Sequence, residues 1–333
     1  MFYDSIIEQS KKKVKGFLKF CCIIFTFEVL FAAQKSQKYF WKSLHKITFI
    51  CYNITVVKCW RQGVTFFEAC RRLKDAGIEN YRYEATLLIE ELCGAFSEDR
   101  DYASETLEAA VNRRCTGYPL QYILGKWWFA RCEFEVNESC LIPRSDTELI
   151  VEYAAKHLPS DARFADLCTG SGCIAVSILD LRADTRAEAY EFFSDTLALA
   201  TRNAERNRVA ERFSPVLGDV LQPDLLGEKT YAAIISNPPY IRRDVIPTLA
   251  VEVQQEPYAA LDGGEDGLVF YRAIVQNFAK NLEENGFFLF EIGYDQANDI
   301  QSVATDNGFS CEVFKDLGGC DRMALLKKFE RRE

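Results

Sequence analysis

The sequence of 333 residues predicts an α/β fold, a mostly parallel sheet with helices on both faces, preceded by a small helical domain. Two observations lead to this prediction. Beyond about residue 145, short apolar runs alternate with longer segments of helical spacing, the pattern of parallel strands joined by helices. Between residues 65 and 94, apolar residues recur at helical spacing only, and Gly77 and Asn80 mark a turn.

Seven segments have the length and apolar content of buried strands. They are residues 163–167, 187–193, 213–217, 231–236, 286–292, 311–315 and 323–327. The most pronounced helical stretches between them cover residues 196–208 and 268–281. Residues 129–136 alternate apolar and polar side chains as a strand would, with turns at Gly125 and Asn137, so we expect a short hairpin before the sheet.

The chain is expected to have four parts. These are an atypical extension (1–60), a helical domain (61–117), a hairpin linker (118–145) and the α/β domain (146–333). The extension holds ten lysines and three acidic residues, so a net charge of +7 there leaves −16 for the remainder of a chain whose total is −9. Lysines precede an apolar run in residues 17–33, but Lys19 and Glu28 interrupt it. We expect an appendage without a catalytic role and no membrane attachment; a membrane tether is the alternative.

Composition narrows the range of functions. A protein that binds a phosphate backbone usually presents a basic face, so the acidic balance disfavours direct binding of nucleic acid. The thirteen cysteines form no C-x-x-C pair and the chain has two histidines, His45 and His157, so no metal site is expected. Reduced, mostly buried thiols are typical of a cytoplasmic protein.

The first predicted strand of the α/β domain runs into a glycine-containing turn. That segment comprises Asp166, Leu167, Cys168, Thr169, Gly170, Ser171 and Gly172. Ligands of open α/β sheets bind at the carboxyl ends of strands, where glycines let the backbone come close to them. Glu191, near the end of the second strand, can accept hydrogen bonds from both hydroxyls of a ribose. Asp219, after the third strand, can reach an adenine amino group.

This turn is compatible with two cofactors. Gly170, Gly172 and Ala175 also match the dinucleotide fingerprint, so a nicotinamide-dependent dehydrogenase remains an alternative. Asp166 favours S-adenosylmethionine, because a carboxylate there can order the loop or meet the methionine ammonium group.

The fourth predicted strand is followed directly by Asn237, Pro238, Pro239 and Tyr240, at the same edge of the sheet. The two prolines fix the backbone and remove two donors, which leaves nearby carbonyls as acceptors. The Asn237 side-chain oxygen and the Pro238 carbonyl can each accept one N–H of a substrate NH2 group, and the Tyr240 ring can stack on a planar amide or base. The sequence therefore predicts a methyltransferase acting on a planar amide or amine nitrogen.

These motifs resemble those of the release factor glutamine N5-methyltransferases, over roughly residues 65–327. Further matching segments are Pro119–Leu120–Gln121–Tyr122, Ile142–Pro143–Arg144 with Asp146–Thr147–Glu148, Glu256–Pro257 with residues 260–268, Glu291–Ile292–Gly293, and Asp316 with Asp321–Arg322. The resemblance implies a class I, Rossmann-like methyltransferase domain of seven strands and a helical domain that helps to bind the release factor. The implied reaction methylates the glutamine of the Gly-Gly-Gln motif of peptide chain release factors and so modulates translation termination.

By the same resemblance, S-adenosylmethionine would contact residues 168–172, Glu191, Asp219, Val220 and Asn237, while residues 237–240 would hold the glutamine amide. Three positions depart from the family pattern. Cys168 replaces the usual glycine, Glu191 the usual Asp, and Val220 a residue that is often aromatic. We expect Cys168 to weaken cofactor binding without abolishing it.

Two alternatives remain within this interpretation. The Asn-Pro-Pro-Tyr loop also suits a flipped base, as in an adenine N6-methyltransferase or another nucleic-acid amino methyltransferase. Cys168 raises the second alternative, a non-catalytic module that binds release factors. The ion-forming residues Arg144, Glu148, Glu256 and Arg322 are as well suited to holding loops as to touching substrate.

Overall fold

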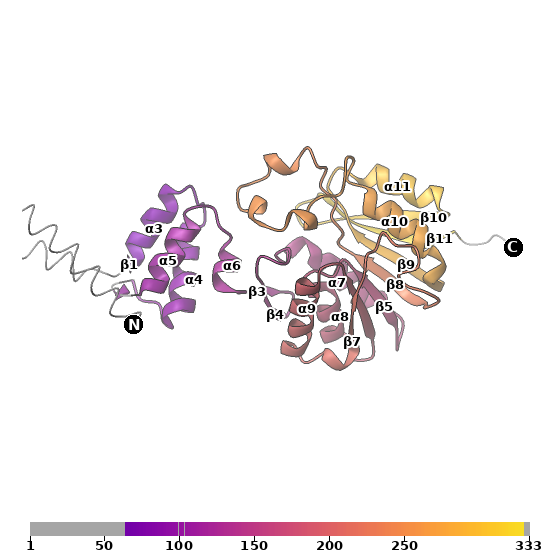
Figure 1. The fold of residues 1–333 in the computed structure, drawn as a ribbon, viewed down its shortest axis with the longest axis horizontal. Coiled ribbons are helices and arrows are strands. Elements are labelled where there is room, and N and C mark those ends of the chain that lie inside the picture. Colours follow the sequence, from indigo (N-terminus) through magenta and orange to yellow (C-terminus); the bar gives the residue numbers. More distant parts are fainter. Residues whose placement is uncertain (1–63, 99, 103, 330–333) are drawn as a thin grey trace, which may run out of the picture. The chain divides into compact units, whose positions relative to one another are not determined.

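The computed structural model describes residues 64–98, 100–102 and 104–329, so the predicted extension lies outside the described residues. Its main feature is a seven-stranded sheet with the strand order β10-β11-β9-β8-β5-β6-β7 (Figure 1). Two short antiparallel pairs, β1-β2 and β3-β4, precede this sheet in the chain. The structure thus confirms the predicted α/β fold with a helical region before it.

The helical region has its own apolar core. Thr65 caps the first helix by accepting the Glu68 N–H at 3.1 Å, and Ser104 caps the third by accepting the Leu107 N–H at 3.2 Å. Leu73, Leu88 and Val111 are fully buried between these helices. The elements are β1 (Val64–Thr65), α3 (Phe66–Asp75), α4 (Tyr81–Cys93), β2 (Asp101–Tyr102), α5 (Glu105–Arg114) and α6 (Leu120–Leu124).

The predicted hairpin before the sheet is present, but the single strand predicted over residues 129–136 is wrong, because the hairpin turns inside that range. Strands β3 (Lys126–Phe129) and β4 (Cys132–Glu135) pair antiparallel, and Phe129 lies opposite Cys132. Ala130 adopts a left-handed φ of 51° at the turn, and its N–H donates to Glu148 Oε1 at 2.9 Å. A left-handed alanine gives no turn signal in the sequence, so the apolar–polar alternation continued through it.

Six strands of the large sheet run in the same direction, and five of them, β9, β8, β5, β6 and β7, are paired side by side; β11 lies antiparallel between β9 and β10. All seven predicted strands are present. Their bounds are β5 (Arg163–Leu167), β6 (Arg186–Glu191), β7 (Phe213–Leu217), β8 (Tyr231–Ser236), β9 (Leu282–Glu291), β10 (Phe309–Lys315) and β11 (Asp321–Lys328). The order and the single antiparallel strand are those of the class I methyltransferase domain implied by the resemblance.

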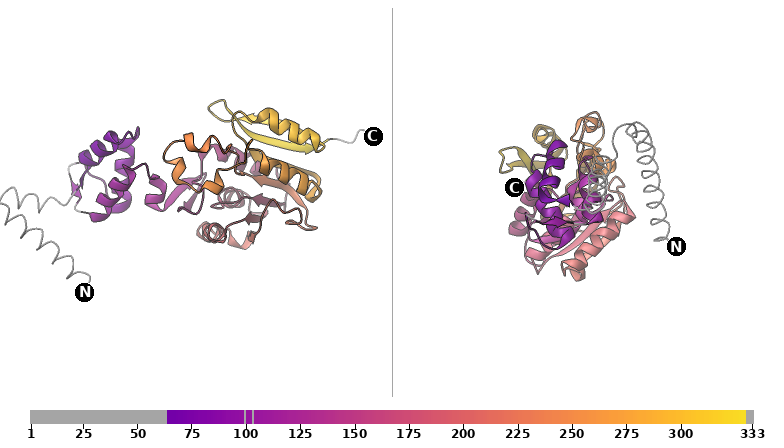
Figure 2. Two further views of the ribbon diagram at one scale, coloured as in Figure 1. Left: turned by 45° about the horizontal axis from the view of Figure 1, so that its top comes forward. Right: turned by 90° about the vertical axis from the view of Figure 1, so that its left-hand side faces the viewer.

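Helices cover both faces of the sheet (Figures 1 and 2). They are α7 (Glu148–His157), α8 (Cys173–Leu181) and α9 (Ser194–Arg206) on one face, and α10 (Val269–Phe278) and α11 (Ala297–Asp306) on the other. Neighbouring strand residues such as Ile234 and Ile235 point to opposite clusters, and both are fully buried. Because both faces are covered, the strands read as continuous apolar runs.

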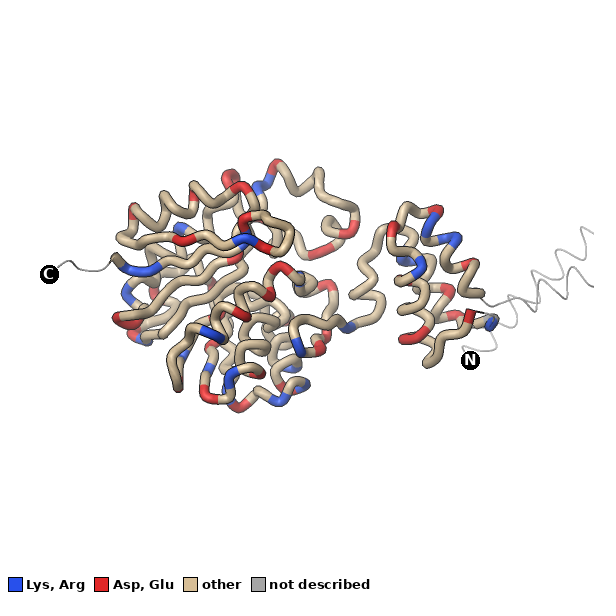
Figure 3. Tube along the Cα trace, turned by 180° about the vertical axis from the view of Figure 1, so that it is seen from behind, with Lys and Arg blue, Asp and Glu red and all other residues tan. Residues whose placement is uncertain are grey.

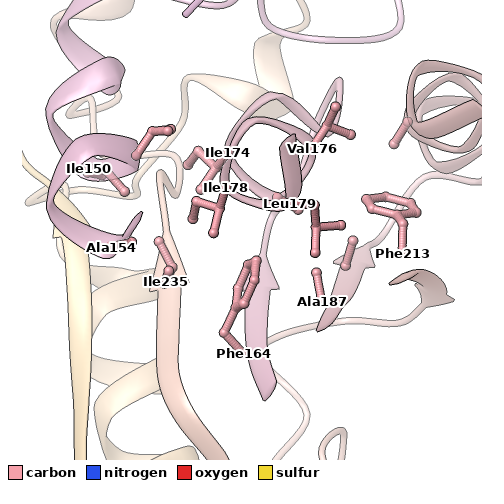
Figure 4. Packing of buried hydrophobic residues seen from close by; sticks show 14 of the residues in the cluster. Ile150, Ala154, Phe164, Ile174, Val176, Ile178, Leu179, Ala187, Phe213 and Ile235 are labelled. Carbon is pink, nitrogen blue, oxygen red and sulfur yellow. The ribbon is translucent and has the colours of Figure 1, made fainter. Parts of the chain in front are cut away.

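Helix α8 lies at the centre of one cluster (Figure 4). Its side chains Ile174, Ile178 and Leu179 pack against Phe164 of β5 and Ile235 of β8. This packing holds α8 against the sheet, so the turn that joins β5 to α8 connects two fixed elements.

Two predicted boundaries differ from the structure for identifiable reasons. Strand β6 ends at Glu191 rather than at residue 193, because the Glu191 carboxylate accepts the N–H groups of Phe192 and Phe193 and so bends the chain out of the sheet. Helix α10 ends at Phe278, and a 3-10 turn, Ala279–Asn281, completes the predicted stretch. Among the described helices, none combines the length and apolar character that crossing a membrane requires.

Candidate functional site

A cavity of about 310 Å³ opens at the carboxyl ends of the parallel strands. Its size is that of a small-molecule site. Of the predicted site residues, those that line it are Cys168, Thr169, Gly170, Ser171, Glu191, Asp219, Val220, Asn237 and Pro239. The structure therefore gathers residues from β5, β6, β7 and β8 around one space. Asp166, Gly172, Pro238 and Tyr240 are not among the lining residues.

Glu191 joins two turns of the cavity wall. Its Oε2 accepts the N–H of Gly170 at 3.0 Å, and its Oε1 accepts those of Phe192 and Phe193 at 2.9 and 3.1 Å. Burial raises the pKa of this carboxyl group, while the three N–H donors act in the opposite direction. Each carboxylate oxygen can accept more than one hydrogen bond, so Glu191 retains capacity for ligand hydroxyls.

Asp166 lies beneath the turn and organises it. Its Oδ2 accepts the Thr169 hydroxyl at 2.6 Å and the Ala175 N–H at 3.2 Å, which ties the turn to the first residues of α8. The Oδ1 atom is buried and has no hydrogen-bond partner in the described structure. Burial is the main cause that raises the pKa of Asp166 to about 7.

Gly172 and Cys168 both have positive φ in this turn. Gly172, at φ 81°, precedes α8, and a Cβ there would lie 3.2 Å from the Cβ of Ala200 in α9, so glycine permits close helix packing. Cys168 adopts φ 57° although it carries a side chain. A left-handed residue other than glycine costs about 1–2 kcal/mol. Burial raises the pKa of its thiol, so Cys168 is not a reactive thiolate.

Asp219 and Val220 line the part of the cavity next to the end of β7. The Asp219 Oδ1 accepts the Leu221 N–H at 2.9 Å and shapes the local turn, and Val220 is buried in the apolar cluster. The sequence had not singled out Phe192 and Phe193, which follow Glu191 and also line the cavity. The sequence feature that could have identified them is that two aromatic residues follow directly after the strand.

The loop after β8 places Asn237 at the cavity, with part of its surface exposed. Its Nδ2 lies 3.4 Å from Thr147 Oγ1. The Thr147 hydroxyl donates to Glu291 Oε2 at 2.5 Å, and the Tyr240 hydroxyl donates to Glu291 Oε1 at 3.2 Å. Tyr240 is thus held through its hydroxyl beside the cavity, and Glu291, at the end of β9, connects both side chains.

The four charged residues named from the sequence, Arg144, Glu148, Glu256 and Arg322, hold loops in place. Arg144 pairs with Glu256, whose Oε2 also accepts the Ile142 N–H at 2.9 Å. Glu148 accepts the Ala130 N–H at the hairpin turn. Arg322 pairs with Asp316 at 3.3 Å and with Asp146 at 3.5 Å. Arg144 is the one of the four that also lines the cavity.

Two family models match the chain, the PrmC N-terminal domain over residues 67–125 and the methyltransferase small domain over residues 145–285. The release factor glutamine methyltransferase of Thermodesulfovibrio yellowstonii is 38% identical, and the alignment covers 70% of this chain and 86% of that protein. The enzyme of the same description from Geobacter sulfurreducens is also 38% identical, with 82% and 95% covered. The chain belongs to the release factor glutamine methyltransferase family.

A solved structure from this family is also similar to the chain in sequence. The release factor-specific protein-(glutamine-N5) methyltransferase of Alicyclobacillus acidocaldarius is 30% identical, covers 59% of this chain and 99% of its own, and superposes with a TM-score of 0.35. The family assignment confirms the predicted enzyme class and makes a dehydrogenase untenable. No group of His, Cys, Asp and Glu suited to a metal ion occurs among the described residues.

The buried carboxyl of Asp166 predicts a pH dependence of stability. Burial raises the pKa of this carboxyl group from the ordinary aspartic acid value of 3.8 to about 7. Between these values the folded state binds more protons than the unfolded state, so stability falls as pH rises, by up to about 1.4 kcal/mol per pH unit. We expect Asp166→Asn to remove this contribution, so that the variant gains stability relative to wild type as the pH rises from about 4 to about 7.

Urea unfolding of both proteins at each pH measures this difference. The control is Asp306→Asn, at the exposed end of α11, which should leave the pH dependence unchanged. If the free energy of unfolding depended on pH in the same way in wild type and in Asp166→Asn, the raised pKa of Asp166 would be contradicted.

Proposed function

We propose that this protein transfers a methyl group from S-adenosylmethionine to the side-chain amide nitrogen of the glutamine in the Gly-Gly-Gln motif of a peptide chain release factor. The observation that supports this most directly is the position of Asn237, an amide at the edge of a cavity whose other walls suit a nucleoside. The relatives of the chain are described by the same activity.

The cavity is suited to S-adenosylmethionine in shape and chemistry. Glu191 offers carboxylate oxygens for ribose hydroxyls, and Phe192, Val220 and Leu221 offer apolar contacts for an adenine ring beside Asp219. The Oγ of Ser171, which lines the cavity, is buried without a partner among the described residues and is a polar atom that a methionine ammonium or carboxylate group could satisfy. Asp166 supports the same region from beneath, because its hydrogen bonds to Thr169 and Ala175 order the turn. We therefore assign Asp166, residues 168–172, Glu191, Asp219, Val220 and Asn237 to cofactor binding.

When bound, S-adenosylmethionine supplies a methyl group on a sulfonium: the nitrogen–carbon bond forms as the sulfur–carbon bond breaks, and the amide nitrogen loses one proton to water. The protein's contribution is to orient the amide. The Asn237 Oδ1 and the Pro238 carbonyl accept the two N–H groups of the glutamine, and no hydrogen bond from the described residues reaches either oxygen. Orientation of this kind contributes about 7–11 kcal/mol in favourable cases.

The charge distribution supports a protein substrate over a nucleic acid. Residues 61–333 carry a net charge of −16. Basic and acidic positions are interspersed along the trace in Figure 3, and many of the arginines are paired with carboxylates, for example Arg202 with Glu135 at 2.8 Å. A surface of this kind lacks the basic stripe expected of an enzyme that binds a nucleic acid backbone.

Replacement of Asn237 tests the assigned reaction. Mass spectrometry of a release factor or a Gly-Gly-Gln peptide should show the gain of one methyl group on glutamine with wild type. With Asn237→Ala we expect a fall of about 10²–10³ in kcat, as for the loss of one preorganised polar group at a reacting centre. Equal rates for the two proteins would contradict the role of Asn237, and label on nucleic acid alone would contradict the proposed substrate.

Cofactor affinity tests the departure at Cys168, and no detectable binding of S-adenosylmethionine by wild type, restored in Cys168→Gly, would favour a non-catalytic binding module. We expect Cys168→Gly to bind S-adenosylmethionine more tightly than wild type, because glycine adopts the observed φ of 57° without strain. Cys168→Ala is the matched control, since it shortens the side chain but keeps the Cβ and therefore the strain. Calorimetry that shows equal affinity for Cys168→Ala and Cys168→Gly would show that side-chain crowding, rather than backbone strain, limits binding.

A further inference from the structure

A side-chain amide such as that of Asn237 has two orientations of nearly equal shape, and only one of them presents oxygen to a substrate NH2 group. The reversed orientation would present an NH2 group to another NH2 group. A site that depends on Asn237 Oδ1 therefore needs a device that fixes the amide before the substrate arrives.

The hydrogen-bond chain behind Asn237 meets this need. Glu291 is 2% exposed and lies at the end of β9, where its two oxygens face the hydroxyls of Thr147 and Tyr240. A hydroxyl has one proton, and the Thr147 proton is donated to Glu291 Oε2 at 2.5 Å. Toward Asn237, Thr147 Oγ1 is therefore an acceptor, which selects the amide orientation with Nδ2 facing it at 3.4 Å.

Glu291 accepts hydrogen bonds at both oxygens, from the Thr147 hydroxyl at Oε2 and from the Tyr240 hydroxyl at Oε1. Burial raises the pKa of its carboxyl group, whereas the Thr147 hydrogen bond, the positive charge of Arg322 and the Tyr240 hydrogen bond act in the opposite direction. Arg322 is in turn held by Asp316 and Asp146. Because the Thr147 and Tyr240 hydroxyls both donate to Glu291, the direction of the whole chain of hydrogen bonds is determined at this carboxyl group.

We propose that Thr147 and Glu291 are positioning residues that orient the Asn237 amide so that its oxygen faces the cavity. This inference rests on the proposed function, because it matters only if Asn237 Oδ1 accepts a substrate N–H. Neither residue needs to touch the substrate. Thr147 comes from the segment after the hairpin, Asn237 from the loop after β8, and Glu291 from the end of β9. Three segments that are distant in sequence therefore meet at this chain of hydrogen bonds.

Thr147→Val tests the proposal, because it keeps the shape of the side chain and removes the acceptor. We expect kcat/KM for release factor methylation to fall about three- to tenfold, the effect of one net hydrogen bond. Thr147→Ser, which retains the hydroxyl, should restore activity, and Thr185→Val, a buried hydroxyl that bonds to Arg182 O at 3.0 Å instead, should not lower it.

A double-mutant cycle separates positioning from a general structural effect. In an Asn237→Ala background, measured under single-turnover conditions with excess enzyme, Thr147→Val should change the rate by less than about twofold, because the residue through which it acts is gone. Thermal unfolding verifies that each variant is folded, and Glu291→Gln takes the place of Thr147→Val if the latter does not fold.

The outcomes distinguish the two levels of the hypothesis. A wild-type enzyme that puts no methyl group on the glutamine overturns the proposed function and this inference with it. An active wild type with an equally active Thr147→Val overturns the inference alone. The same fall in rate with and without Asn237 would show that Thr147 acts on the site as a whole and not through the amide.

Discussion

The candidate site depends on one geometric constraint, which is that five parallel strands end at the same edge of a sheet buried on both faces. Each of these strands contributes to the region of the cavity: the turn after β5, Glu191 of β6, Asp219 after β7, Asn237 after β8 and Glu291 of β9. The Ser236 hydroxyl donates to the Leu167 carbonyl at 2.6 Å and ties the ends of β8 and β5 together. The cofactor turn and the substrate loop are therefore fixed relative to each other by the sheet itself.

Buried carboxylates are the second recurring feature of this edge. Asp166, Glu191 and Glu291 are each less than one-tenth exposed, and each accepts hydrogen bonds from backbone N–H groups or hydroxyls of neighbouring segments. Burial of a carboxylate is costly unless donors compensate for it. In this structure the donors belong to the loops that must be positioned, so the requirement to satisfy each carboxylate also orders the site.

The sequence was sufficient for the fold because strand alternation and helical spacing are local signals. It was also sufficient to identify the turn at Cys168 and the loop at Asn237, because both follow directly on apolar strands. The hairpin turn at Ala130 was missed, since no turn residue marks it. The link from Asn237 through Thr147 to Glu291 could not be predicted either, because it joins residues that are 90 and 144 positions apart, although both flanking segments had been noticed.

The most direct test of this account is a crystal structure with S-adenosylhomocysteine and a Gly-Gly-Gln peptide bound together. The account predicts the glutamine NH2 within hydrogen-bond distance, about 2.7–3.2 Å, of Asn237 Oδ1 and the Pro238 carbonyl. It also predicts that Asn237 Nδ2 still faces Thr147. A glutamine amide held elsewhere in the cavity, or an Asn237 amide that has turned its nitrogen toward the substrate, would contradict it.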